Sequence, residues 1–190
     1  MAGLTFRKRK KRINYTMVKE VVVWIMELVL AFGIACLLVM NFGVAISNVG
    51  QSMEPTISSG DKVLTNRLVY HMTSPKRGDL VVFKPNGNES SHYYIKRVIG
   101  LPGETVQIID GFIYIDGEVL VEEIKFDKIQ FAGTAEDPIK LGNDEYFVLG
   151  DNRNASEDSR NAEIGSIRKQ DITSKAWFDI TMGSNFGRIE

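Results

Sequence analysis

Ser52 is a candidate nucleophile because of the segment that holds it. It lies within residues 50–56, which read Gly-Gln-Ser-Met-Glu-Pro-Thr. Pro55 favours an extended backbone at Glu54, so we expect Ser52 on a constrained, non-helical turn. Taken alone, a serine in a turn is most often a cap or a backbone hydrogen-bonding residue. It becomes a nucleophile when a neighbouring base takes its proton, so the chemistry requires a partner.

Lys96 is the candidate base. It lies in the apolar run of residues 93–100 and, on an extended chain, shares a face with Tyr94 and Val98. Burial on such a face disfavours the charged amine and lowers its pKa toward the working pH. A neutral lysine can then take the proton of Ser52. The alternative is an edge-strand lysine whose stem lies on the sheet while its ammonium group reaches water.

A third segment, residues 150–160, is a dense polar loop that follows the apolar run 145–149. The hydroxyl of Ser156 is of the kind that orients a lysine amine, and Asp158 and Arg160 carry opposite charges that would hold the loop together. The same composition is also typical of a solvated turn. The loop is therefore a candidate support for a serine–lysine pair rather than a site by itself.

Histidine and cysteine are scarce in this chain. It has two histidines, His71 and His92, and one cysteine, Cys36. Neither histidine lies in a recognisable catalytic context, which disfavours a Ser-His-Asp mechanism, and the same shortage disfavours a zinc site. A single cysteine excludes an internal disulfide framework. We therefore expect no metal and no cofactor.

Charge and hydropathy divide the chain into a basic N-terminal segment, an apolar span and an acidic remainder. Residues 21–46 are apolar apart from Glu27, and a helix of that length crosses a hydrocarbon core of about 30 Å. Seven basic and two acidic residues lie in residues 1–46, which leaves 16 basic and 22 acidic residues for residues 47–190. The positive-inside rule then predicts a single-pass protein of the cell membrane with residues 1–20 in the cytoplasm and residues 47–190 outside. A cleaved signal peptide is the alternative, but its apolar region usually spans only about 7–15 residues.

Beyond about residue 60 the apolar residues alternate with a period of two, which indicates strands. Asp-Gly pairs at residues 110–111 and 116–117 predict hairpins. Residues 122–143 are more polar and irregular and indicate a loop or a small cap. The expected fold class is mainly β, with an antiparallel β core preceded by one transmembrane helix. The net charge of the whole chain is −1, which disfavours a dedicated nucleic-acid binder. The expected strands lie within residues 61–70, 78–84, 92–100, 104–120 and 145–151.

Four ordered motifs together resemble the bacterial type I signal peptidases, in the single-span form typical of Gram-positive bacteria. The motifs are Ser52-Met53-Glu54-Pro55-Thr56, Gly60-Asp61-Lys62-Val63, Lys96-Arg97-Val98-Ile99-Gly100-Leu101-Pro102-Gly103 and the run from Gly150 to Arg160. The resemblance covers roughly residues 20–180. It implies a largely antiparallel β catalytic core with an SH3-like barrel element, and a small insertion or cap at about residues 104–145.

The same resemblance implies roles for individual residues. It makes Ser52 the nucleophile and Lys96 the general base. Gly50 stands where some family members supply a serine hydroxyl as second oxyanion donor. The family also has supporting positions. Its hydroxyl that orients the lysine amine matches Ser156, and its ion pair matches Asp158 and Arg160. Two further positions, expected to be structural, match Asp151 and Arg97. Its substrate-binding strand edges match Gly50, Gln51, Tyr94 and Ile95.

The implied reaction is cleavage of signal peptides from secretory preproteins after small residues in an Ala-X-Ala-like pattern. The implied partners are signal peptides and membrane lipid, close to the secretion translocon. Two alternatives stay open at this point. One is a pilin-processing or pilus-assembly specialist of the same family. The other is an inactive, membrane-tethered β module that binds extended peptides.

Overall fold

The computed structural model describes residues 15–42, 44–85, 92–182 and 186–189. The basic run at residues 7–12, on which the cytoplasmic tail was predicted, lies outside these residues. The chain divides into two compact units, with the boundary between Val39 and Met40.

The first unit is helical. Helix α1 (Tyr15–Phe42) begins six residues before the predicted span of 21–46. At the other end, Val44–Ser47 form strand β1 because all four residues pair with strand β2 (Lys62–Asn66). The apolar side chains along the helix are exposed, Trp24 and Leu28 each by 71%. By length and composition, α1 is the one helix among the described residues that is long and apolar enough to cross a membrane.

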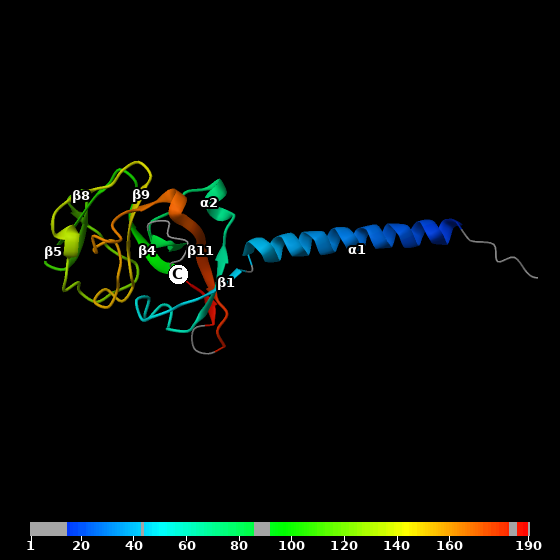
Figure 1. Ribbon diagram of the computed structural model, residues 1–190, viewed down its shortest axis with the longest axis horizontal. Helices are drawn as coiled ribbons and strands as arrows, with labels where there is room; N and C mark the ends of the chain where they lie inside the picture. Colours follow the sequence, from blue (N-terminus) through cyan, green and yellow to red (C-terminus); the bar gives the residue numbers. More distant parts are fainter. Residues whose placement is uncertain (1–14, 43, 86–91, 183–185, 190) are drawn as a thin grey trace, which may run out of the picture. The chain divides into compact units, whose positions relative to one another are not determined.

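The second unit is built from two antiparallel sheets, which confirms the mainly β prediction (Figure 1). The larger sheet has the order β1-β2-β11-β3-β4-β9-β10, with β12 paired to β11. The smaller sheet has the order β7-β6-β5-β8. The remaining strands of the larger sheet are β3 (Leu80–Phe83), β4 (Tyr94–Gly100), β9 (Glu145–Leu149), β10 (Ile167–Arg168), β11 (Ile172–Asp179) and β12 (Gly187–Arg188). Those of the smaller sheet are β5 (Thr105–Ile109), β6 (Phe112–Ile115), β7 (Glu118–Val119) and β8 (Ile139–Lys140).

Both predicted hairpins are confirmed in the smaller sheet. Strands β5 and β6 turn at Asp110-Gly111, and β6 and β7 turn at Asp116-Gly117. All four turn residues have positive φ, from 48° to 88°, as a two-residue type I′ turn requires. The irregular region expected at residues 122–143 contains only a 3-10 turn, η2 (Gly133–Glu136), and the two-residue strand β8.

The strand expected over residues 61–70 is interrupted. Strand β2 ends at Asn66, and a single helical turn, α2 (Val69–Met72), follows it. The Asn66 carboxamide oxygen accepts hydrogen bonds from the main-chain N–H groups of Leu68 (2.9 Å) and Val69 (3.2 Å). An asparagine that bonds the backbone two and three residues ahead offers it an alternative to the sheet, so the strand stops there.

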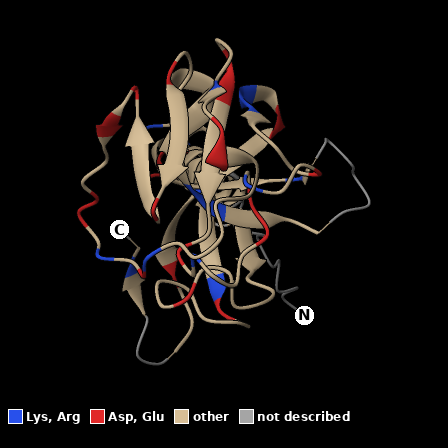
Figure 2. Ribbon diagram, turned by 90° about the vertical axis from the view of Figure 1, so that its left-hand side faces the viewer, with Lys and Arg blue, Asp and Glu red and all other residues tan. Residues whose placement is uncertain are grey.

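Strand β4 is the element that positions the site. It lies between β3 and β9, and its residues from Ile95 to Gly100 are all buried. Alternate side chains enter different clusters, because Ile95 packs with Leu80 and Val82 while Val98 packs with Val81 and Phe83. Acidic and basic residues are scattered in short segments over the strands and loops of the domain, and the basic ones do not gather on one face in this view (Figure 2).

Candidate active site

Lys96 lies on β4 directly opposite Val81 of β3. Only 1% of the lysine is exposed, and its ammonium group lies 5.6 Å from the centre of the Tyr94 ring. Burial lowers the pKa of Lys96 to about 8, against the opposing effect of the Asp158 and Glu157 carboxylates. The edge-strand alternative, in which the amine stands in water, does not describe this buried side chain. A substantial fraction of Lys96 is therefore neutral near pH 8.

Gly150 is the residue around which the candidate groups meet. Arg97 pairs with Leu149, so Gly150 follows at the level of Lys96. The Gly150 α-carbon lies against the main-chain carbonyl of Ser52 and the hydroxyl of Ser156, leaving no room for a side chain. The N–H of Asn152 donates to the same Ser52 carbonyl at 3.1 Å. The fold thus brings together Ser52 and Ser156 beside β4 at the height of Lys96.

The turn that carries Ser52 is held from both ends. Met53 is fully buried in the cluster of Ile95 and Leu80, which anchors the residue next to Ser52 in the core. Upstream, the buried carboxamide of Asn48 donates to the carbonyls of Ile57 (3.2 Å) and Ser58 (3.0 Å). These contacts keep the turn closed on itself.

Arg97 and Asp151 form a buried, bidentate ion pair beside the site. The guanidinium donates from Nε to Oδ1 and from Nη2 to Oδ2, both at 2.7 Å, and from Nη1 to the carbonyl of Gly78 at 2.9 Å. The hydroxyl of Thr56 donates to Asp151 Oδ2 at 2.5 Å. The pair therefore connects the strand of Lys96, the polar loop and the turn of Ser52.

Asp158 and Arg160 form a second buried pair, as the composition of the loop predicts. The Arg160 guanidinium donates to both carboxylate oxygens of Asp158 at 2.8 Å. The carboxylate also accepts from the N–H of Gly150 at 3.1 Å. The Ser156 hydroxyl is buried and has no hydrogen-bond partner among the described residues. Its proton and lone pairs therefore stay available to a polar group in the site.

The residues expected to bind substrate fall into two groups. Gly50 and Gln51 are exposed, and Gly50 adopts a positive φ of 91°. Tyr94 is half-buried, and its hydroxyl donates to Glu157 at 3.4 Å. The side chain of Ile95 is buried in the core, so only its main chain could pair with an added strand. Among the described residues, the strand pairing of β9 with β4 begins at Arg97, which leaves one main-chain edge of residues 94–96 without a strand partner.

The site also uses residues that the sequence did not single out. Asn48 closes the Ser52 turn, and Asn152 holds it through the carbonyls of Gln51 and Ser52. Arg153 is fully buried and forms a bidentate pair with Glu122. Asn152 and Arg153 lie inside the predicted polar loop, so its density of polar residues was the signal. Asn48 and Glu122 lie in segments that carry no such signal.

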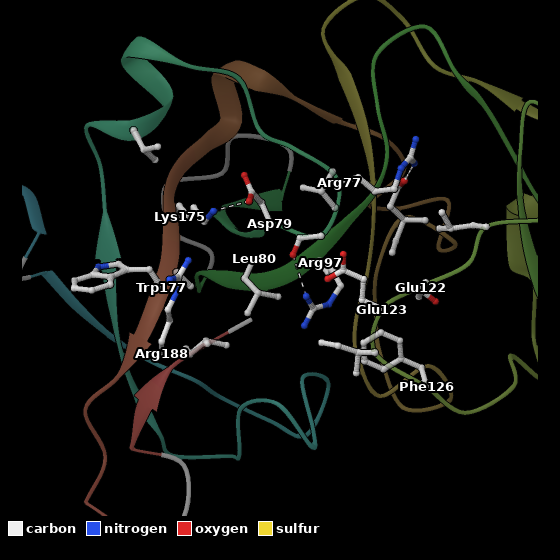
Figure 3. Close-up of a pocket in the computed structure, with 18 of the residues that line it drawn as sticks. Arg77, Asp79, Leu80, Arg97, Glu122, Glu123, Phe126, Lys175, Trp177 and Arg188 are labelled. Carbon is white, nitrogen blue, oxygen red and sulfur yellow. Dashed lines mark hydrogen bonds and ion pairs between the residues drawn. The ribbon is translucent and has the colours of Figure 1, made fainter.

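A cavity of about 1020 Å³ lies on another part of the domain (Figure 3). Its walls include Arg97, Leu80, Trp177 and Phe126, but neither Ser52 nor Lys96. The cavity therefore shares Arg97 with the surroundings of the candidate site but contains neither of the two candidate catalytic residues. Within the described ranges, no group of three His, Cys, Asp or Glu side chains is arranged to hold a metal.

Comparisons with known proteins agree on one family. A family model described as "Signal peptidase, peptidase S26" matches residues 21–181. Signal peptidase I P of Bacillus subtilis subsp. natto is 40% identical over 131 residues, 65% of this chain and 68% of that protein. Signal peptidase I S of Bacillus subtilis strain 168 is 35% identical over 177 residues, 88% of this chain and 93% of that protein. A crystal structure of a signal peptidase I from Enterococcus faecalis V583 aligns at 29% identity and a TM-score of 0.44, covering 55% of this chain and 97% of that chain.

Proposed function

Because the chain belongs to the signal peptidase family, peptidase S26, and is a serine endopeptidase, we propose that it cleaves signal peptides from secretory preproteins with Ser52 as nucleophile and Lys96 as general base. The observation that carries the proposal is the meeting of Ser52 and Ser156 around Gly150, at the level of a buried lysine. The lowered pKa of Lys96, about 8, supports its role as a base near neutral pH.

The proposed reaction has two halves. Ser52 Oγ attacks the carbonyl carbon of the scissile peptide bond while Lys96 Nζ takes the hydroxyl proton. The N–H of Ser52 donates to the developing oxyanion. Lys96 then returns the proton to the leaving amine nitrogen, the C–N bond breaks, and an acyl-enzyme ester remains. A water molecule that gives its proton to Lys96 hydrolyses the ester and frees Ser52.

Substrate would bind as an added strand. The main-chain edge of residues 94–96 that has no strand partner and the exposed Gly50–Gln51 segment flank the site, and an extended peptide between them would bond to both. We propose that Gly50, Gln51, Tyr94 and Ile95 supply these contacts, with cleavage after small residues as in the family. Gly50 has no hydroxyl, so the second oxyanion donor comes from elsewhere.

The anchor would keep the site at the membrane surface. Helix α1 would span the bilayer, with the basic N-terminal residues in the cytoplasm and the β domain outside, close to lipid and to the translocon. Residues 43–51 connect α1 to Ser52, and nine residues span at most about 32 Å. A connection of this length would keep Ser52 near the membrane surface, where the apolar segment of a signal peptide would end.

The test is cleavage of a preprotein by the detergent-solubilised full chain. Ser52→Ala and Lys96→Ala should abolish cleavage while retaining the wild-type circular dichroism spectrum. Ser47→Ala and Lys62→Ala are matched controls, because Ser47 and Lys62 are exposed, pair with each other across β1 and β2, and should not matter. Wild-type rates in either site variant would refute the dyad. Binding without cleavage by the wild type would favour an inactive peptide-binding module.

The orientation is tested separately. Protease added to intact spheroplasts should digest residues 47–190 and leave the N-terminal residues protected. Protection of the β domain would contradict the proposed topology.

A further inference from the structure

The segment after the smaller sheet runs beside the polar loop of residues 150–160. Glu122 pairs with Arg153, and Asn154 bonds through its carboxamide to Lys128 and Gln130. Further along, the Arg160 guanidinium donates to the carbonyl of Phe131. The main-chain carbonyl of Arg160 accepts from the hydroxyl and the N–H of Thr134. We call residues 122–134 the brace. It contacts the loop at three places, spread from Arg153 to Arg160.

Arg153 is the most enclosed of these contacts. Its Nη1 and Nη2 donate to the two oxygens of Glu122 at 3.0 and 2.6 Å, and its Cζ lies 4.2 Å from the centre of the Phe126 ring. Its Nε is buried and has no partner among the described residues. A buried guanidinium needs charge compensation, which Glu122 supplies, and the Phe126 ring adds a cation–π attraction.

Phe126 also lies near the other arginine of the site. The Arg97 Cζ is 5.4 Å from the centre of the same ring. Arg97 directly follows Lys96 and pairs with Asp151, which in turn accepts from Thr56 in the turn of Ser52. One aromatic ring therefore lies beside two of the guanidinium groups that tie the polar loop to its surroundings.

Hydrophobic burial does not account for this position. Phe126 belongs to none of the three buried hydrophobic clusters of the domain. It lies on the wall of the cavity of about 1020 Å³, together with Arg97 and Glu122 (Figure 3). A phenylalanine beside an open space and next to two arginines contributes mainly by what it does to those arginines.

We propose that Glu122 and Phe126 are positioning residues of the peptidase reaction. By holding Arg153, and in the case of Phe126 also Arg97, they fix the loop that presents Gly150 and Ser156 to Ser52 and Lys96. The inference rests on the proposed function, because it assigns two more residues to the same site. A loop displaced by about 1 Å is enough to lower the rate about 100-fold.

The kinetic test compares Glu122→Gln and Phe126→Leu with the wild-type full chain in detergent. Both should lower kcat about tenfold or more and change KM by less than about twofold, because the change misplaces catalytic groups without removing substrate contacts. Phe126→Tyr keeps the ring and should restore most of the rate. Glu123→Gln and Phe186→Leu are the controls, since Glu123 forms no ion pair with another described residue and Phe186 is 60% exposed and lies outside the brace.

A background experiment asks whether Glu122 acts through Arg153. In Arg153→Met, kcat should already be low, and Glu122→Gln should lower it no further. An undiminished loss from Glu122→Gln in that background would overturn the inference. So would wild-type kcat in both single variants, or a loss that disappears when rates are corrected for the folded fraction.

Hydrogen exchange separates this inference from the proposed function, because it does not depend on activity. In both variants the amides of Gly150 and Ser159 should exchange faster, while those of β5 and β6 keep their protection. If the wild type cleaves no preprotein but the loop amides exchange faster in both variants, the brace does hold the loop and the proposed function fails. Unchanged loop exchange in an active enzyme overturns the brace alone.

Discussion

The main-chain carbonyl of Ser52 occupies the space that a side chain on Gly150 would need. The hydroxyl of Ser156 crowds the same space from another direction. Because one of these obstacles is backbone, rotating a side chain does not relieve the conflict. The close approach is possible only for glycine, and it is what brings the polar loop against the turn of the proposed nucleophile.

Replacing Gly150 by alanine should therefore separate the two segments. We expect Gly150→Ala to lower kcat/KM about 100-fold or more, as displacement of catalytic groups by about 1 Å does. The measurement is preprotein cleavage at a temperature where circular dichroism shows a folded domain. Gly142→Ala is the matched control, because a side chain there meets only the flexible Glu145 side chain, at 3.2 Å or more. Wild-type activity in Gly150→Ala would show that the contact is not needed.

The pH dependence of cleavage should report the lysine. With a pKa of about 8, Lys96 is mostly charged at pH 6 and unable to accept a proton. The value of kcat/KM should thus rise with pH and be about 100-fold lower at pH 6 than on the alkaline plateau. A rate that stays constant down to pH 6 would contradict Lys96 as the base.

Glu157 provides a way to shift that profile. Its exposed carboxylate raises the pKa of Lys96, so Glu157→Gln should lower that pKa and move the acid limb toward lower pH. The variant keeps an oxygen for the Tyr94 hydroxyl, which donates to Glu157 at 3.4 Å. A limb that moves toward higher pH, or stays in place, would mean that another group controls the rate.

Much of the fold follows from the sequence, and the family resemblance is confirmed by the match over residues 21–181. The alternating apolar residues and Asp-Gly pairs predicted the antiparallel strands and both hairpins. Strand β11 was not predicted, although it pairs with β2, β3 and β12. Its inward residues include Ser174 and Ala176, and its pairing is irregular between Ala176 and Phe178, so its apolar alternation is weak.

The candidate site, like the fold, was predicted from the sequence only in part. Reactive residue types within short motifs indicated Ser52, Lys96 and the polar loop, and their catalytic roles remain predictions. The contacts that support the loop cross between segments distant in the chain, such as the pair of Glu122 with Arg153, 31 residues apart. A single sequence has no periodicity that reports such a pair, because its geometry arises only when the smaller sheet packs beside the larger one.

The buried pair of Arg97 and Asp151 should be a stability determinant as well as part of the site. Asp151→Asn removes the charge that compensates a buried guanidinium, which we expect to cost about 3–5 kcal/mol in urea unfolding. The pair of Arg77 and Glu104 is the comparison, since its side chains are 30% and 21% exposed. Glu104→Gln should cost less because water screens that pair. Equal losses for the two variants would argue against burial as the cause.

The last prediction separates the function of Lys96 from its contribution to folding. Its pKa falls from 10.5 in a free side chain to about 8 in the folded protein, so folding favours the neutral form and the charged form opposes folding. The free-energy cost of burying the charged lysine is fully present below pH 8 and decreases as the pH rises from 8 to 10.5. It disappears above pH 10.5, where the lysine is neutral in both the folded and the unfolded protein. Each pKa unit corresponds to about 1.4 kcal/mol, so the cost near pH 7 is about 3 kcal/mol.

Lys96→Met keeps the length of the side chain and removes the charge. We therefore expect an inactive protein that is more stable than the wild type at pH 7, by up to about 3 kcal/mol. The gain should shrink between pH 8 and 10.5, as measured by urea unfolding across that range. Lys62→Met, at an exposed position of β2, should show no such dependence. A stability difference between Lys96→Met and the wild type that does not change between pH 8 and 10.5 would contradict the lowered pKa of Lys96 in the folded protein.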